Sequence, residues 1–292
     1  MKRLARSSIA AALALACTAA LSACSDSGPR NLLQDIEAGH VVLGTKFDQP
    51  GLGARTPQKE FVGVDPDVSR FVVSYIANKH GWEEPEITWR ETPSAQRETL
   101  INNGEVDMIA ATYSISASRL RAVDFAGPYL LTHQAILVRA DDPISGLKDM
   151  NADTKLCSVT GSTPAQKIKK ALPEVQLQEF DTYSACVEAL ARGKVDALST
   201  DATILAGFAQ QYPGTMKVIE LKNEDGSYWT NENYGIGIAQ GQPEAIAEIN
   251  EALNALHDSG EYEKIIQNNL GDAIDPGTKP KIGDLSFTEE KK

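Results

Sequence analysis

A short sequence pattern occurs twice in this chain. The segment LINNGEVDMIAAT, from Leu100 to Thr112, is echoed by LARGKVDALST, from Leu190 to Thr200. Each copy has the pattern of a helix end, a glycine that stops the helix, and a short apolar strand that ends in hydroxyl side chains. Two copies of one helix-to-strand unit predict two lobes of similar α/β construction.

Predicted strands and helices alternate on both sides of these copies, which is typical of α/β proteins. We expect a helix to begin at Asp65 as its N-cap and to stop at Gly81, and a strand at 123–125 to be closed by Gly127-Pro128. Further strands are predicted at 40–44, 86–90, 108–111, 134–138, 155–159, 175–180, 195–199, 216–221 and 234–238, and further helices at 95–103, 183–192, 202–211 and 244–257.

The order of these elements predicts a hinge between the lobes. The chain is expected to leave the first lobe near Tyr129 and to return near Tyr234. Two crossing strands would let the lobes close around a ligand.

Residues 1–23 have the pattern of a secretory signal. Basic residues precede an apolar run from Ile9 to Leu21, which is shorter than the roughly 20 residues of a membrane span. The ending Leu-Ser-Ala-Cys resembles the lipobox of bacterial lipoproteins, in which the signal is cut before the cysteine and the cysteine is lipidated. We expect lipidated Cys24 to anchor the protein to the membrane through a polar tether, residues 24–38. The alternative is a soluble secreted protein with an incidental cysteine.

Charge and composition exclude some classes of partner. The formal net charge is −12, and removal of a basic signal makes the mature protein still more acidic, which argues against nucleic acid. The four histidines and the two cysteines beyond the signal and its cleavage site, Cys157 and Cys186, show no metal-ligand spacing. We expect neither a metal nor a cofactor. Residues 272–292 are polar and are expected to be mobile or to lie on the surface as a tail.

Two cysteines, Cys157 and Cys186, remain in the folded body after export. Outside the cytoplasm such a pair favours a disulfide. The alternative is two buried thiols, because both lie in apolar contexts.

The stretch from Asp107 to Tyr129 has the features of a ligand site. Thr112 and Ser114 follow a buried strand, and Arg119 comes shortly after them. Ligands of open α/β sheets bind beyond the carboxyl ends of the strands, where a guanidinium group can grip a carboxylate with two parallel hydrogen bonds. The alternative is an ordinary surface arginine.

Three other segments add candidate residues. Lys46 follows the first strand, where it is either a cleft cation or a surface charge. The turn 160–164 opens a helix and offers backbone N–H groups to an anion, but lacks the glycine-lysine pattern of a nucleotide loop. Asp201 is either the N-cap of the helix that follows it or the partner of an ammonium group across the cleft.

Together these motifs resemble the family 3 extracellular solute-binding proteins, the amino-acid receptors of ABC uptake systems. The likeness covers about Leu32 to Gly271 and is carried by GVDPDV, GEVDMIAATYSIS, SRLRAVDFAGPY, GSTPAQ and STDATIL. The segments GTKFDQPGLG, SAQRETL, PYLLTHQA and CSVTGSTPAQ further resemble glutamate-binding lipoproteins. The resemblance implies a type II periplasmic-binding-protein fold, with lobe 1 at 39–130 and 233–271 and lobe 2 at 131–232.

The resemblance also implies which residues hold the common groups of an amino acid. It assigns the ligand α-carboxylate to Arg119 and Ser114, with Thr163 closing from the second lobe. It assigns the α-ammonium group to the Thr112 carbonyl and the Asp201 carboxylate.

For the ligand side chain, the resemblance assigns a carboxylate to Lys46 and Arg97, with Ser94 and Thr160 as lesser contacts. Gln49 is a weaker candidate from its loop alone. Members that bind neutral amino acids usually have an acid or an aromatic residue at the position of Lys46 and an aromatic residue at the position of Pro93, to stack on the ligand, and this chain has neither. A charged ligand side chain is therefore expected.

The expected function is capture of L-glutamate, or of aspartate, and delivery to a membrane permease by a monomeric protein. The alternatives are a binder of glutamine or another polar amino acid, and a cleft enzyme such as a dehydratase. No catalytic residue stands out, since the sequence contains neither a GxSxG nor an HExxH motif.

Overall fold

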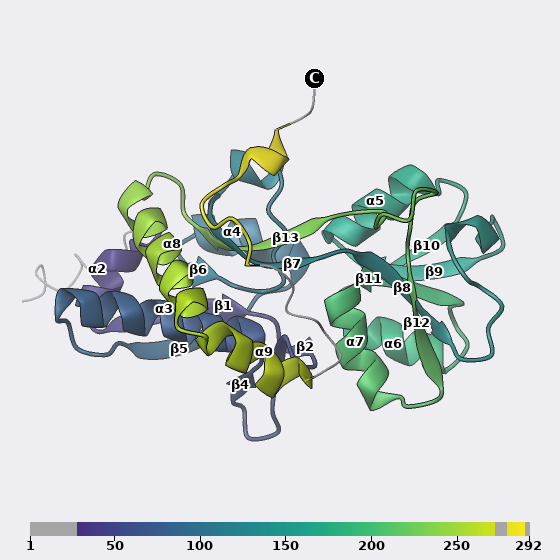
Figure 1. Cartoon of the computed structure of the whole chain (residues 1–292), viewed down its shortest axis with the longest axis horizontal. Helices are drawn as coiled ribbons and strands as arrows, with labels where there is room; N and C mark the ends of the chain where they lie inside the picture. The colour runs from purple at the N-terminus through teal and green to yellow at the C-terminus, as the bar shows by residue number, and fades with distance from the viewer. Residues whose placement is uncertain (1–27, 272–278, 290–292) are drawn as a thin grey trace, which may run out of the picture.

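The computed structural model describes residues 28–271 and 279–289. Two five-stranded sheets, each covered by helices, form two lobes that lie side by side along the long axis of the molecule (Figure 1). The predicted two-lobed α/β class is confirmed.

The sheet of lobe 1 is mixed. Its first three strands are parallel, whereas β13 runs antiparallel to both of its neighbours. Helices α2, α3, α8 and α9 pack on one face and α4 on the other. In spatial order the strands are β5 (Glu86–Glu91), β1 (His40–Thr45), β6 (Met108–Ile109), β13 (Glu232–Ile238) and β7 (Asp124–Thr132); the helices are α2 (Leu32–Glu37), α3 (Val64–His80), α4 (Arg97–Asn102), α8 (Pro243–Asp258) and α9 (Glu261–Leu270).

The sheet of lobe 2 follows the same plan. Its first three strands are again parallel, and β8 runs antiparallel to both neighbours. The strands in spatial order are β10 (Gln176–Phe180), β9 (Lys155–Val159), β11 (Ala197–Asp201), β8 (Gln134–Arg139) and β12 (Met216–Glu220); the helices are α5 (Thr163–Ala171), α6 (Tyr183–Ala191) and α7 (Ala202–Gln211). The two sequence copies end in β6 and β11, each the central strand of its sheet.

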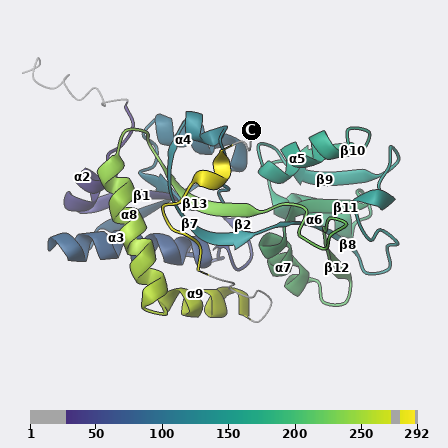
Figure 2. The ribbon, with the colours of Figure 1, turned by 45° about the horizontal axis from the view of Figure 1, so that its top comes forward.

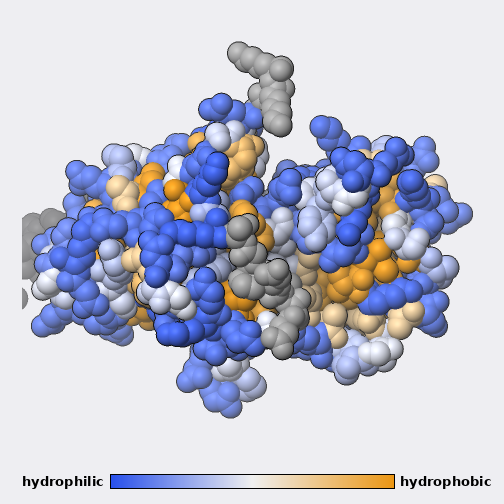
Figure 3. All heavy atoms as spheres, viewed as in Figure 1, coloured by the Kyte–Doolittle hydropathy of each residue, from blue (hydrophilic) through white to orange (hydrophobic). Residues whose placement is uncertain are grey.

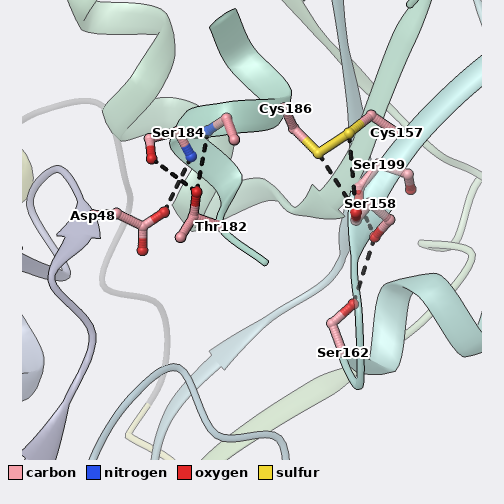
Figure 4. The surroundings of a disulfide bond; sticks show 9 residues. Asp48, Cys157, Ser158, Ser162, Thr182, Ser184, Cys186 and Ser199 are labelled. Carbon is pink, nitrogen blue, oxygen red and sulfur yellow. Dashed lines mark hydrogen bonds between the residues drawn. A yellow bond between two sulfur atoms is a disulfide. The ribbon is translucent and has the colours of Figure 1, made fainter. Parts of the chain in front are cut away.

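Cys157 on β9 and Cys186 on α6 form a disulfide with Cα atoms 5.8 Å apart (Figure 4). Both side chains are fully buried. The predicted disulfide is confirmed, and the alternative of two free thiols is wrong.

The chain crosses between the lobes twice, along adjacent strands (Figures 1 and 2). Strand β7 runs through Gly127-Pro128, a cis peptide, to Thr132, and β8 begins at Gln134 in the other sheet. Strand β13 brings the chain back, with Glu232 paired to Thr132. The prediction that Gly127-Pro128 closes a short strand was wrong, because β13 supplies a ladder on which β7 continues. We call β7 and β13 the hinge strands.

The expected tether, residues 24–38, is too long. Leu32 and Ile36 of α2 are fully buried in the core of lobe 1, one helical turn apart. The Asn31 side chain accepts a hydrogen bond from the Gln34 N–H at 3.1 Å and caps this helix. This end of the segment therefore belongs to the folded body.

A small antiparallel sheet extends lobe 1 toward lobe 2. It consists of β2 (Asp48–Gln49), β3 (Gly53–Arg55) and β4 (Phe61–Val62), and β2 contacts α6 and α7. The described part of the C-terminal tail lies on lobe 1, where the Gly283 N–H donates to the Gly127 carbonyl at 2.7 Å (Figure 2).

The face drawn in Figure 3 is mostly hydrophilic. Across residues 28–271 and 279–289, every helix is too short or too polar to span a membrane.

Candidate ligand-binding site

Two cations of lobe 1 are buried at the edge of its sheet. Lys46 follows β1 and is 3% exposed, and its Nζ donates to Ser94 Oγ at 2.8 Å. Ser94 opens a single 3₁₀ turn that leads directly into α4, whose first residue, Arg97, is 2% exposed. The predicted helix 95–103 is thus a 3₁₀ turn followed by a shorter α-helix, and this start brings Ser94 and Arg97 beside Lys46.

The Arg97 guanidinium group faces backbone carbonyls. Its Nη1 donates to the Ala111 carbonyl oxygen at 3.0 Å and to the Thr112 carbonyl oxygen at 3.4 Å. The guanidinium carbon, Cζ, lies 4.1 Å from the centre of the Tyr113 ring. Arg97 Nε is buried without a partner. The Thr112 carbonyl, expected to accept an ammonium group, thus accepts from Arg97 in this structure.

Thr112 has the left-handed backbone conformation, with φ of 47°. This conformation is strained for a β-branched residue and persists only where the surroundings impose it. Asp65 Oδ2 accepts a hydrogen bond from the Thr112 N–H at 2.8 Å. The strand therefore ends at Ile109 rather than at the predicted Ala111, and the chain turns sharply at its carboxyl end.

Arg119 joins the two lobes. It begins a 3₁₀ turn and is 7% exposed. Its Nη1 donates to the Ser114 carbonyl at 2.7 Å and to Thr163 Oγ1 at 3.0 Å, and its Nη2 donates to the Gly161 carbonyl at 3.1 Å. The Nε lies 3.2 Å from a Glu98 carboxylate oxygen. The alternative of an ordinary surface arginine is wrong.

Asp201 lies at the end of β11 and is 2% exposed. It occupies the N-cap position of α7, but its side chain makes no capping hydrogen bond. Instead Oδ2 accepts from the Tyr234 hydroxyl at 2.6 Å, and Oδ1 is buried without a partner. The Asp201 side chain therefore does not cap α7.

Gln49 and Thr160, also predicted as ligand contacts, differ in their surroundings. Gln49 on β2 is fully buried, and both atoms of its amide lack a partner. The Thr160 side chain is exposed, and the Thr160 N–H donates to the Phe180 carbonyl at 2.9 Å. Gln49 fits an interior site better than Thr160 does.

Burial and like charge shift the pKa values of the cations. Burial, followed by the neighbouring Arg97, lowers the pKa of Lys46 to about 7. Burial, followed by the neighbouring Arg119, lowers the pKa of Arg97 to about 10. These side chains form an electropositive interior that an anion would stabilise.

Burial also raises the pKa values of two acids in this region, Asp65 and Asp201. It raises the pKa of Asp65 to about 6. Burial, with Glu232 as the second cause, raises the pKa of Asp201 to about 7. A cation next to Asp201 would lower its pKa again.

Sequence reasoning missed Asp65, Tyr129 and Tyr234 as parts of this region. The prediction that Asp65 is an N-cap was wrong, because the helix begins at Val64 after Gly63 and the Asp65 side chain turns inward. The motif GVDPDV contains Asp65, but an acid beside a helix start has the same pattern in either role. No local signal distinguished the two tyrosines.

A groove of about 780 Å³ opens between the lobes beside Arg119. Residues of both lobes line it, among them Ser94, Ser116, Thr163 and Lys167. Among the residues that the structure describes, no group of three or more His, Cys, Asp or Glu side chains could hold a metal ion.

Comparison with known proteins shows the family of this chain. Residues 41–272 match the model of the bacterial extracellular solute-binding proteins, family 3. The glutamate-binding protein GluB of Corynebacterium efficiens is 56% identical over 272 residues, 92% of each chain. The ABC transporter glutamine-binding protein GlnH of Bacillus subtilis is 32% identical over 77% of this chain and 79% of its own. An ancestral arginine-binding protein bound to glutamine has a TM-score of 0.70 and 28% identity, covering 80% of this chain and 99% of that chain. The chain therefore belongs to family 3 of the bacterial extracellular solute-binding proteins.

Proposed function

We propose that this protein binds L-glutamate between its lobes and delivers it to the membrane permease of an ABC importer. The observation that carries the proposal is a set of buried charges where the two lobes meet. Lys46, Arg97 and Arg119 in lobe 1 are 3%, 2% and 7% exposed, and Asp201 of lobe 2 is 2% exposed. Glutamate has two carboxylates and one ammonium group, so its charges complement this set.

In this proposal Arg119 grips the α-carboxylate, with Ser114 beside it and Thr163 closing from lobe 2. The ammonium group lies between the Thr112 carbonyl and Asp201 Oδ1. The side-chain carboxylate binds Lys46 and Arg97, with Ser94 and Gln49 as lesser contacts; Thr160 is retained only as a rim contact, because its side chain is exposed.

The relatives support an acidic ligand. The GluB relative is 56% identical to this chain, whereas the GlnH relative is 32% identical. A permease partner fits the name of the GlnH relative, which is an ABC transporter protein.

We infer that the protein binds its ligand without chemical conversion. An enzyme would need a general acid or base free to reach the ligand. His133, which follows hinge strand β7, pairs with Glu220 and stacks on Tyr228 at a ring distance of 3.5 Å. It is therefore engaged elsewhere.

We also propose that the protein is a monomer anchored to the outer face of the cell membrane. The signal, residues 1–23, and the lipidation site Cys24 lie outside the described residues. Their sequence pattern supports the membrane anchor. Mass spectrometry of the membrane fraction would find a lipidated N-terminal Cys24; an unmodified, released protein would contradict the anchor.

Titration calorimetry of protein that begins after Cys24 tests the ligand. We expect glutamate to bind more tightly than aspartate or glutamine. The double variant Lys46→Ala with Arg97→Ala should weaken glutamate by roughly 30-fold or more, because a buried carboxylate loses its partners. Glutamine should lose much less. Equal losses for both amino acids would show that Lys46 and Arg97 do not read the side-chain carboxylate, and tighter binding of glutamine by the wild type would overturn the proposed ligand.

A further inference from the structure

Each hinge strand carries a buried tyrosine. Tyr129 lies on β7 and Tyr234 on β13, and both side chains are fully buried. Tyr234 pairs with Leu130, the neighbour of Tyr129, and the two ring centres lie 6.5 Å apart. The two phenol groups therefore lie together where the chain crosses between the lobes.

Both hydroxyls donate to a buried carboxylate at 2.6 Å. Tyr129 donates to Asp65 Oδ1, and Tyr234 donates to Asp201 Oδ2. The two acids belong to different lobes, since Asp65 lies on α3 and Asp201 ends β11. The Tyr234 bond thus runs from a hinge strand to lobe 2.

The second oxygen of each carboxylate has a different use. Asp65 Oδ2 accepts the Thr112 N–H at 2.8 Å and holds Thr112 in its left-handed conformation. Asp201 Oδ1 is buried and has no partner. A carboxylate whose one oxygen is held by a strong hydrogen bond presents the other in a fixed direction.

We propose that Tyr234 and Tyr129 are positioning residues for the ligand's ammonium group. Tyr234 orients Asp201 directly, and Tyr129 orients Thr112 through Asp65. The inference rests on the proposed function only in that the ligand is an amino acid. It does not depend on which side chain that amino acid carries.

The Tyr234 hydroxyl also favours the ionised form of Asp201. Other charged and titratable groups act on this carboxylate: Glu232 on β13 raises its pKa, and Lys167 on α5 and Arg119 lower it. Asp201 in turn raises the pKa of Tyr183 on α6. Removing the hydroxyl should therefore raise the pKa of Asp201 and leave more of it neutral at pH 7.

The test compares Tyr234→Phe and Tyr129→Phe with the control Tyr75→Phe. The Tyr75 hydroxyl donates to the Glu251 carboxylate at 3.0 Å on the exposed surface of lobe 1, so the control removes the same kind of bond elsewhere. Affinity for glutamate, aspartate and glutamine is measured by calorimetry from pH 5 to pH 8, and the Asp201 carboxyl is titrated by carbon NMR.

For Tyr234→Phe we expect about a tenfold loss of affinity at pH 7. The titration midpoint of Asp201 should move to higher pH. The pH below which affinity falls should move to higher pH as well. Tyr129→Phe should weaken binding without moving the Asp201 midpoint, and Tyr75→Phe should match the wild type. A lower melting temperature with unchanged affinity and midpoint would reduce Tyr234 to a structural role and overturn the proposal.

If the wild type binds aspartate or glutamine in place of glutamate, the proposed ligand fails and the same comparison is made with the amino acid that binds. If it binds none of the three, the NMR midpoint of Tyr234→Phe decides alone, and an unchanged midpoint overturns the inference.

Discussion

A Cβ atom added at Gly207 on α7 would lie 2.1 Å from the carbonyl oxygen of Pro50, which belongs to lobe 1. Gly207 lies inside a helix without a left-handed backbone, so its conformation does not require glycine. Nearby, the Ser184 N–H at the start of α6 donates to Asp48 Oδ2 at 3.1 Å (Figure 4). The loop after β1 therefore packs directly on lobe 2 in this structure.

This contact predicts that Gly207→Ala hinders closure. The added methyl group meets backbone atoms of Pro50, which cannot move aside as a flexible side chain can. We expect about a tenfold or greater loss of ligand affinity, although alanine stabilises a helix interior by about 1 kcal/mol relative to glycine. Calorimetry with small-angle scattering measures both affinity and closure.

The matched control is Gly146→Ala in the same lobe, where an added Cβ meets nothing within 4 Å and the backbone is extended. It should bind and close as the wild type does. Wild-type affinity in Gly207→Ala would mean that full closure does not need this contact.

Arg119→Ala should abolish detectable ligand binding. It removes the guanidinium group that contacts Ser114 in lobe 1 and both Thr163 and Gly161 in lobe 2. Arg119→Lys keeps the charge but loses the planar fork, so binding should be partly retained. Arg121→Ala, on the same 3₁₀ turn but exposed, is the control for calorimetry. Wild-type affinity in Arg119→Ala would exclude Arg119 from the site.

The double variant Cys157→Ser with Cys186→Ser should be less stable than the wild type. The bridged cysteines are 29 residues apart in sequence, and closing a loop of that size contributes about 3–4 kcal/mol to the free energy of unfolding. Urea unfolding with and without reductant measures the loss. The double variant should show no further effect of reductant; an unchanged urea midpoint would mean that the bond contributes little.

The lobes could be predicted from the sequence, because apolar runs mark the strands. The candidate site could be proposed at Arg119 because this residue follows the carboxyl end of a central strand. The contact of Gly207 with Pro50 could not be predicted, because a glycine within a helical pattern does not reveal what approaches it.

The inward role of Asp65 was also out of reach. It depends on Gly63, which precedes the helix with φ of 127°, and on Tyr129, which is distant in sequence. Long-range contacts of this kind decide the function of a residue whose local pattern fits a simpler role. The predicted length of the tether failed for a related reason, since the apolar pair Leu32 and Ile36 in a short polar segment is a weak signal.

The pH dependence of binding should reveal the buried charges. Lys46 has its pKa lowered to about 7 by burial and then by Arg97, and a bound carboxylate would raise it again. Above pH 7 glutamate binding must therefore take up a proton, so affinity should fall by up to about tenfold per pH unit, whereas below pH 7 Lys46 is already charged. Asp201, with its pKa raised to about 7, must lose a proton to accept the ammonium group, so affinity should also fall toward acid. The profile should peak near pH 7. In Lys46→Met the alkaline limb should disappear while the acid limb remains, and calorimetry in buffers of different ionisation enthalpy would count the protons.

The pH dependence of stability in the ligand-free protein gives an independent check on the pKa of Lys46. The pKa of Lys46 is about 7 in the folded protein and 10.5, its ordinary value, in the unfolded chain. Between these two pH values the unfolded chain therefore binds more protons than the folded protein, so the free energy of unfolding should rise with pH. The rise should be larger in the wild type than in Lys46→Met.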